Sequence, residues 1–120
     1  RFIDLYRSQQ DDYVQDVAVF LVSNFRMPIF EPALRQRLNW TIRHFFHFAR
    51  GFAAKQRDTA FEFRLALGLS RSFLTSTRFE LDNDFAYEMG ERGIYLLERL
   101  IEHGPERQQE FALPESILYY

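Results

Sequence analysis

Hydrophobic residues recur three or four positions apart in four segments of this 120-residue chain. This spacing brings apolar side chains to one face of an α-helix and differs from the alternation that is typical of β-strands. It predicts helices over residues 11–25, 33–55, 59–77 and 85–103, with the first helix extending back through Leu5 and Ile3.

The segments between these helices carry residues that favour turns. Pro28 and Pro32 disfavour helical geometry in the residues before them, and Gly104, which a proline follows, predicts the end of the fourth helix. Asp58 or Thr59 is expected to cap the third helix. Short connections join antiparallel neighbours. We therefore predict an all-α fold, an antiparallel four-helix bundle over residues 1–105.

Residues 106–120 form a C-terminal tail that is too apolar to be purely solvated. We expect this tail to dock on its own bundle or on a neighbouring subunit. Three glycines within the predicted helices, Gly68, Gly90 and Gly93, are expected to permit close contact between helices. The apolar tail residues are Phe111, Leu113, Ile117, Leu118, Tyr119 and Tyr120.

The formal charge of −2 conceals two zones of opposite sign. Residues 33–57 contain six cations and no acid, and Arg43, Arg50 and Arg57 recur every seven residues, which places them on one stripe of the second helix. An acidic stripe follows on the fourth helix. Such stripes can meet within one bundle or across a subunit boundary, where charge sets the register. The acidic residues are Asp84, Glu88, Glu91, Glu98 and Glu102.

The second helix is apolar around much of its circumference. Trp40, Phe45, Phe46 and Phe48 cannot all face one narrow groove. A helix of this kind is central in its domain, is buried in an interface, or lines an aromatic ligand pocket. Because aromatic residues and arginine are enriched among interface hot spots, we expect partner contacts here and on the charged stripes. The predicted contact residues are Trp40, Arg43, Phe46, Arg50, Arg57, Asp84, Glu88, Glu91 and Glu98.

Motifs for catalysis or metal binding are not evident in the sequence. The chain has no cysteine, and the histidines lack the Glu-x-x-His spacing of di-metal bundle sites, although His44 and His47 share a helix face. Hydroxyl residues between 70 and 77 have no nearby base in the sequence. We expect no enzyme activity, no cofactor and no metal.

The bulk composition narrows the classes of partner. A slightly acidic chain does not suit a general nucleic-acid or membrane binder, so nucleic acid is expected only at the basic helix, residues 33–57. The apolar runs are far shorter than the ~20 residues of a membrane span, and no signal peptide is visible. We expect a soluble, cytoplasmic protein.

Two short motifs resemble those of the small four-helix-bundle proteins encoded in 23S ribosomal RNA intervening sequences, relatives of the retroelement accessory variability determinant. Ala-Arg-Gly-Phe at 49–52 is similar to the Ala-Glu-Gly segment of that family, and Ala-Leu-Gly at 66–68 follows an aromatic-rich lead-in. The resemblance implies a non-enzymatic bundle that forms ring-like oligomers. In retroelement members it also implies contact with a reverse transcriptase and RNA.

Two functional interpretations follow from these observations. The first is a non-enzymatic helical scaffold or adaptor that forms homo-oligomers and binds another protein. The alternative is an effector-binding and dimerisation domain, because residues 59–77 and 85–103 also resemble the paired dimerisation helices of tetracycline-repressor-type regulators. That alternative requires a DNA-binding helix-turn-helix before Arg1.

Overall fold

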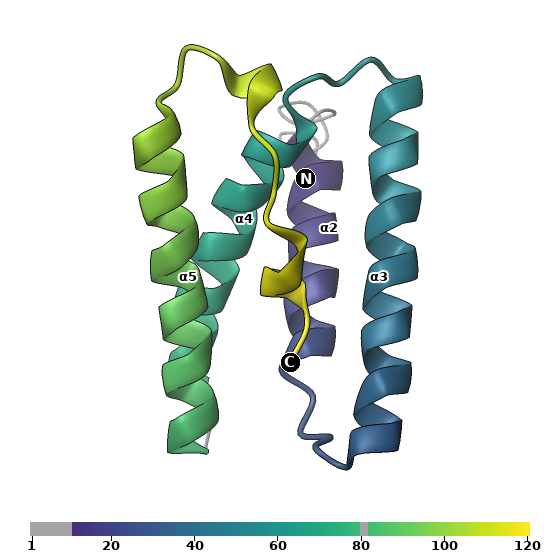
Figure 1. The fold of residues 1–120 in the computed structure, drawn as a ribbon, viewed down its shortest axis with the longest axis vertical. Coiled ribbons are helices and arrows are strands. Elements are labelled where there is room, and N and C mark those ends of the chain that lie inside the picture. Colours follow the sequence, from purple (N-terminus) through teal and green to yellow (C-terminus); the bar gives the residue numbers. More distant parts are fainter. Residues whose placement is uncertain (1–10, 80–81) are drawn as a thin grey trace, which may run out of the picture.

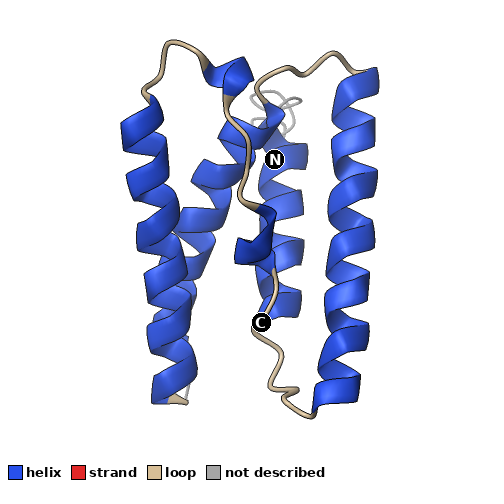
Figure 2. Cartoon of the chain, in the orientation of Figure 1, coloured by secondary structure: helices blue, strands red, loops and turns tan. Residues whose placement is uncertain are grey.

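A computed structural model describes residues 11–79 and 82–120, and all regular structure in this part of the chain is helical (Figure 2). The predicted all-α class is confirmed. Leu5 and Ile3, which were expected to extend the first helix, lie outside the described residues. The long helices are α2 (Asp11–Phe25), α3 (Pro32–Lys55), α4 (Phe61–Ser76) and α5 (Asn83–His103), and the short 3-10 helices are η1 (Thr77–Phe79), η2 (Gln108–Glu110) and η3 (Glu115–Leu118).

The first turns of α3 and α5 are held by capping side chains. Helix α3 starts at Pro32, whose fixed φ suits the first helical position, and Glu31 accepts a hydrogen bond from the Leu34 amide at 3.0 Å. Helix α5 starts at Asn83, two residues earlier than predicted, because the Asp82 carboxylate accepts a hydrogen bond from the Phe85 amide at 3.1 Å.

Helix α4 starts at Phe61 instead of Thr59, and the prediction that Asp58 or Thr59 caps it is wrong. The N-cap residue is Ala60, which has no capping side chain. The Asp58 carboxylate instead accepts hydrogen bonds from the Tyr13 hydroxyl and from Arg64 Nη1, the latter at 2.7 and 2.8 Å. Burial and the neighbouring Asp58 raise the pKa of the Tyr13 phenol. Asp58 therefore ties α2 to α4.

The four long helices alternate in direction, as an antiparallel bundle requires (Figure 1). Helices α2 and α4 pack against each other, α3 packs mainly on α2, and α5 packs mainly on α4. As a result, α3 and α5 form opposite edges of the molecule. The C-terminal tail runs between them (Figure 1).

The core is a single cluster of aromatic and aliphatic side chains that the long helices and the tail share. Phe25 lies at its centre, edge-on to Phe73 at a ring distance of 5.2 Å and stacked on Phe85 at 5.4 Å. The largest fully buried side chains are Phe25, Phe46, Phe73, Phe85, Leu21, Ile42, Leu65, Leu69, Met89, Leu96 and Leu118.

Two of the three helix glycines lie at close helix contacts, as predicted. A Cβ atom on Gly93 would come within 2.8 Å of Leu74 Cγ and 3.2 Å of the Ser70 carbonyl oxygen, so a side chain here would push α5 away from α4. A Cβ on Gly68 would come within 3.0 Å of Ala18 Cβ on α2. Gly90 differs, because a Cβ there would make only an ordinary contact of 3.8 Å with Thr77.

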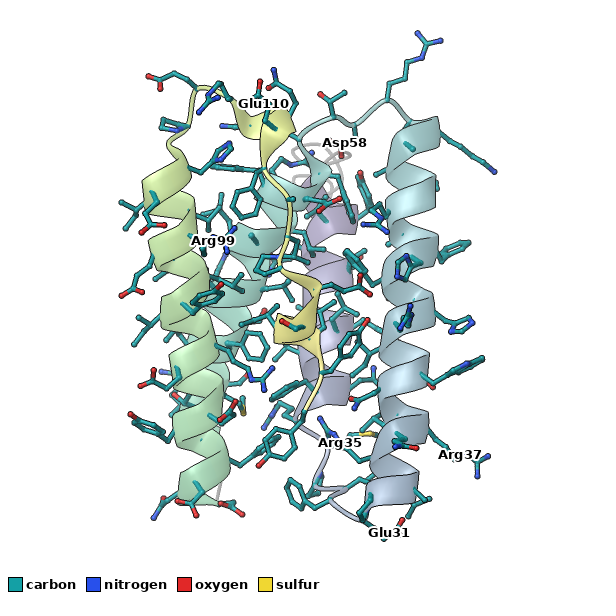
Figure 3. All side chains as sticks on the ribbon, viewed as in Figure 1. Glu31, Arg35, Arg37, Asp58, Arg99 and Glu110 are labelled. Carbon is teal, nitrogen blue, oxygen red and sulfur yellow. The ribbon has the colours of Figure 1, made fainter. Side chains whose placement is uncertain are left out.

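Arg35 is a buried cation within the fold, with only 4% of its surface exposed. Its guanidinium donates hydrogen bonds to the carbonyl oxygens of Phe25 at 2.7 Å and Met27 at 3.1 Å, which are at and just beyond the end of α2. The Phe25 oxygen, at the last residue of α2, has no partner within the helix. Arg35 therefore caps α2 from α3 and does not belong to the surface cations (Figure 3).

Candidate partner-contact surface

The outward side of α3 combines exposed aromatic rings with positive charge. We call Arg37, Trp40, His44, Phe48, Gly51 and Lys55 the α3 outer face, since all six are exposed and follow one stripe of the helix. Trp40 is 60% exposed and Phe48 is 70% exposed. Arg37 points away from the body of the molecule (Figure 3). Large apolar groups beside cations on one face form a surface suited to association.

Trp40 and His44 are held together on this face. Their rings lie 3.8 Å apart, and His44 Nδ1 lies 3.1 Å from the Trp40 carbonyl oxygen. The contact orders the indole while leaving most of it in water. A pre-ordered aromatic side chain loses less conformational entropy when a partner covers it.

Phe46, one of the predicted contact residues, lies in the core. Phe46 is 0% exposed, so it is a core residue and is not available to a partner in this fold. The reason is its angular position on α3, which is the same as that of the buried Ile42 and Ala49 and faces α2.

Arg50 and Arg43 lie on the flank of α3 that faces the tail. The Arg50 guanidinium lies 5.1 Å from the Phe46 ring centre, donates to His47 Nδ1 at 2.9 Å, and lies 3.6 Å from the Glu62 carboxylate. Arg43 is exposed, and its charge helps to lower the pKa of Glu115 in the tail. Both arginines therefore support the tail of their own chain.

Arg57 does not continue the arginine stripe. Helix α3 ends at Lys55, and Arg57 lies in the following turn with a left-handed φ of 59°. Of the three arginines that recur every seven residues and were predicted to form one stripe, only Arg43 and Arg50 lie on the helix.

The outward side of α5 alternates acidic and apolar residues. We call Asp84, Tyr87, Glu91, Ile94, Glu98 and Ile101 the α5 outer face, since all six are exposed and succeed one another at spacings of three and four. Tyr87 is 71% exposed and Ile101 is 78% exposed. A hydrogen bond to Glu91 raises the pKa of the Tyr87 phenol.

Glu88 is the one predicted acidic contact residue that lies off this face. It is on the flank near the tail, where its carboxylate accepts a hydrogen bond from Arg92 Nε at 2.9 Å and lies 2.8 Å from Arg92 Nη2. The predicted acidic stripe is therefore divided: Asp84, Glu91 and Glu98 face outward, whereas Glu88 binds the arginine that holds the tail.

The basic and acidic stripes do not meet within one chain. Helices α3 and α5 lie on opposite edges of the molecule, with α2, α4 and the tail between them (Figure 1). Of the two arrangements considered for the stripes, pairing within one bundle is therefore wrong, and pairing between subunits stays a prediction.

The tail docks on its own bundle through a polar network that the sequence did not indicate. The Glu115 carboxylate lies 3.0 Å from His47 Nε2 and accepts a hydrogen bond from the Tyr119 hydroxyl at 2.5 Å. Burial raises the pKa of Glu115, but these two hydrogen bonds, together with the nearby positive charge of Arg43 and His47, outweigh it and hold the pKa below its usual range. The Leu113 amide donates to Glu62 at 2.8 Å.

Arg92 on α5 fixes the other side of the tail. Its Nη1 donates to the carbonyl oxygens of Ile117 at 2.9 Å and Tyr119 at 2.8 Å. The same guanidinium lies 4.8 Å from the centre of the Phe25 ring. Contacts between residues so far apart in the chain leave no local pattern, which is why periodicity alone did not reveal them.

Three hydroxyl residues of α4 and η1 make local backbone contacts. Ser70 Oγ donates to the Leu67 carbonyl at 2.9 Å, and Thr75 and Thr77 donate to carbonyls one turn earlier. This is the usual way in which a helix satisfies such side chains. Within residues 11–79 and 82–120, His, Asp and Glu side chains form no group of three or more that could hold a metal ion.

Comparison with protein-family models, with curated proteins and with solved structures finds no match. The resemblance to the intervening-sequence bundles therefore stays a prediction. In the described part of the chain, no helix combines the length and the apolar character needed to cross a membrane.

Proposed function

We propose that this chain is a non-enzymatic, self-associating helical scaffold that uses its outward helix faces to contact protein partners. The observation that carries this proposal is the exposure of Trp40 and Phe48 on the α3 outer face. Two large aromatic rings in water cost free energy that a partner would recover by covering them. The flanking cations favour a partner that carries negative charge.

Mutation of these aromatic residues tests the proposal. We expect the unmodified chain to form an oligomer heavier than its 14.5 kDa monomer by light scattering after size exclusion. The double variant Trp40→Ser/Phe48→Ser should lose this assembly and keep its helical circular dichroism spectrum, because neither ring belongs to the core. Leu67→Ser is the matched control, since Leu67 is a half-exposed apolar residue on α4, away from both outer faces.

Salt provides a second measurement of the same assembly. Raising the ionic strength from about 0.1 M to about 1 M shortens the screening length from about 10 Å to about 3 Å. If charge helps to align the subunits, the oligomer should loosen as salt rises. A wild-type mass of one monomer at every protein concentration would overturn self-association.

The alternative, an effector-binding domain of a tetracycline-repressor-type regulator, has less support. An effector site would need a closed apolar cavity, whereas the space between the helices holds Phe25, Phe46, Phe73 and Phe85, all fully buried. Self-association accounts better for aromatic residues that remain outside. The repressor alternative stays a prediction.

A further inference from the structure

We propose that the α3 outer face of one copy binds the α5 outer face of a second copy. This inference rests on the proposed self-association and names the two surfaces that would meet. Both faces are exposed along their whole length, and each carries large apolar side chains between residues of a single sign of charge. The α3 face has Arg37 and Lys55, and the α5 face has Asp84, Glu91 and Glu98.

The two faces have matching lengths. The α3 outer face extends over 18 residue steps and the α5 outer face over 17, which correspond to about 27 Å and about 26 Å of helix at 1.5 Å per residue. Two straight helices can therefore pack side by side along the complete stripe. Helix packing of this kind places the ridges of side chains on one helix into the grooves of the other.

The order of residues along the faces is also complementary. With the helices antiparallel and His44 opposite Glu91, Arg37 lies opposite Glu98 and Phe48 lies opposite Tyr87. With the helices parallel and His44 again opposite Glu91, Arg37 lies opposite Asp84 and Trp40 lies opposite Tyr87. In either direction, Arg37 lies opposite a carboxylate and an aromatic residue of the α3 outer face lies opposite Tyr87.

Pairing of like faces is opposed by charge. Two α5 outer faces would bring together three carboxylates from each copy, and two α3 outer faces would bring together the arginine and the lysine of each copy. Like charges placed across an interface cost free energy and suppress the wrong pairing. Pairing of unlike faces removes this penalty.

The position of the two faces determines the type of assembly. Because α3 and α5 form opposite edges of the molecule, one copy can bind a second copy on each side (Figure 1). An interface between two different surfaces is heterologous, and its repetition gives a closed ring or an open chain of subunits. The tail does not block it, since the tail lies between the two helices and leaves both outer faces exposed.

A mixing experiment with two blocked variants tests the pairing. One variant, Trp40→Ser/Phe48→Ser, lacks a working α3 outer face, and the other, Glu91→Lys/Glu98→Lys, lacks a working α5 outer face. Each variant alone should have the monomer mass of 14.5 kDa. Each still carries the face that the other has lost, so an equimolar mixture should form a species of twice that mass and nothing larger.

The outcomes separate this inference from self-association itself. If the wild-type chain assembles but the α5-blocked variant keeps the wild-type mass, the α3 faces pair with each other and the inference is wrong. If the α3-blocked variant keeps the wild-type mass, the α5 outer faces pair with each other, and the inference is again wrong. A monomeric wild-type chain would instead overturn the proposed self-association.

A fluorescent single-stranded RNA added to the same samples tests whether the α3 outer face binds nucleic acid instead of a second copy. One outcome would contradict the inference: the wild-type chain binds this RNA, the α3-blocked variant does not, and the two proteins have equal masses. The α3 outer face would then bind nucleic acid and not a second copy. We expect no difference in RNA binding between the two proteins.

Discussion

At the scale of single residues, position on a helix decides what each arginine of α3 does. Arg35 is buried and caps the end of α2, Arg50 supports the tail, and Arg37 points into solvent. In the sequence, all three belong to one run of cations. Their roles differ because a rotation of 100° per residue sends neighbouring side chains to different surroundings.

This difference gives a prediction about stability. Arg35→Met should lower the free energy of unfolding by about 2–4 kcal/mol, because it leaves the buried carbonyl oxygen of Phe25 without its hydrogen-bond donor and removes a second bond to the Met27 carbonyl. Arg37→Met, on the same helix and in solvent, should change it by less than about 0.5 kcal/mol. Urea unfolding followed by circular dichroism measures both values. Equal effects in the two variants would contradict the capping role of Arg35.

At the scale of elements, the contact between α4 and α5 depends on the absence of a side chain at Gly93. Gly93→Ala should destabilise the protein by about 1–3 kcal/mol, because the new Cβ would overlap Leu74 and press on the Ser70 carbonyl. Gly90→Ala, one turn earlier on α5, has room for its Cβ and should stabilise the helix by up to about 1 kcal/mol. Thermal unfolding compares the two, and a stabilising Gly93→Ala would refute the close contact.

The stability of tail docking should depend on pH through Glu115. The pKa of Glu115 is lowered in the fold, so its ionised form stabilises docking above the ordinary pKa of a glutamate, and this contribution is lost as the pH falls below that value. Glu115→Gln should therefore be less stable than wild type near pH 7, with a difference that shrinks as the pH falls from about 5 to about 3.

The measurement is urea unfolding of both proteins across this pH range. Glu110→Gln is the matched control, since Glu110 is an exposed tail residue that pairs only with Arg107 in the described contacts. A stability difference between wild type and Glu115→Gln that does not vary with pH would contradict the role of the Glu115 carboxylate.

At the scale of the whole molecule, apolar periodicity was sufficient to predict the helices and their antiparallel order, because each helix repeats the same local pattern over several turns. It was not sufficient to separate Phe46, which is buried, from Trp40, which is exposed, since both lie on a helix that is apolar nearly all round. Which of the two side chains is buried depends on which side of α3 is covered by α2, and this is a tertiary contact. The tail contacts of Glu62 and Arg92 join distant residues and have no periodicity to detect.

The place of the tail between α3 and α5 also has a consequence for the order of folding. The contact of Leu113 with Glu62 joins residues that are 51 positions apart in the sequence, and the contact of Glu115 with His47 joins residues 68 positions apart. Each long helix, by contrast, packs on the helix next to it or next but one in the sequence. Contacts of long sequence separation form late, because closing the chain between them costs entropy. On the ribosome the tail also emerges after the four helices. Until it docks, the apolar surface that it covers is open to water.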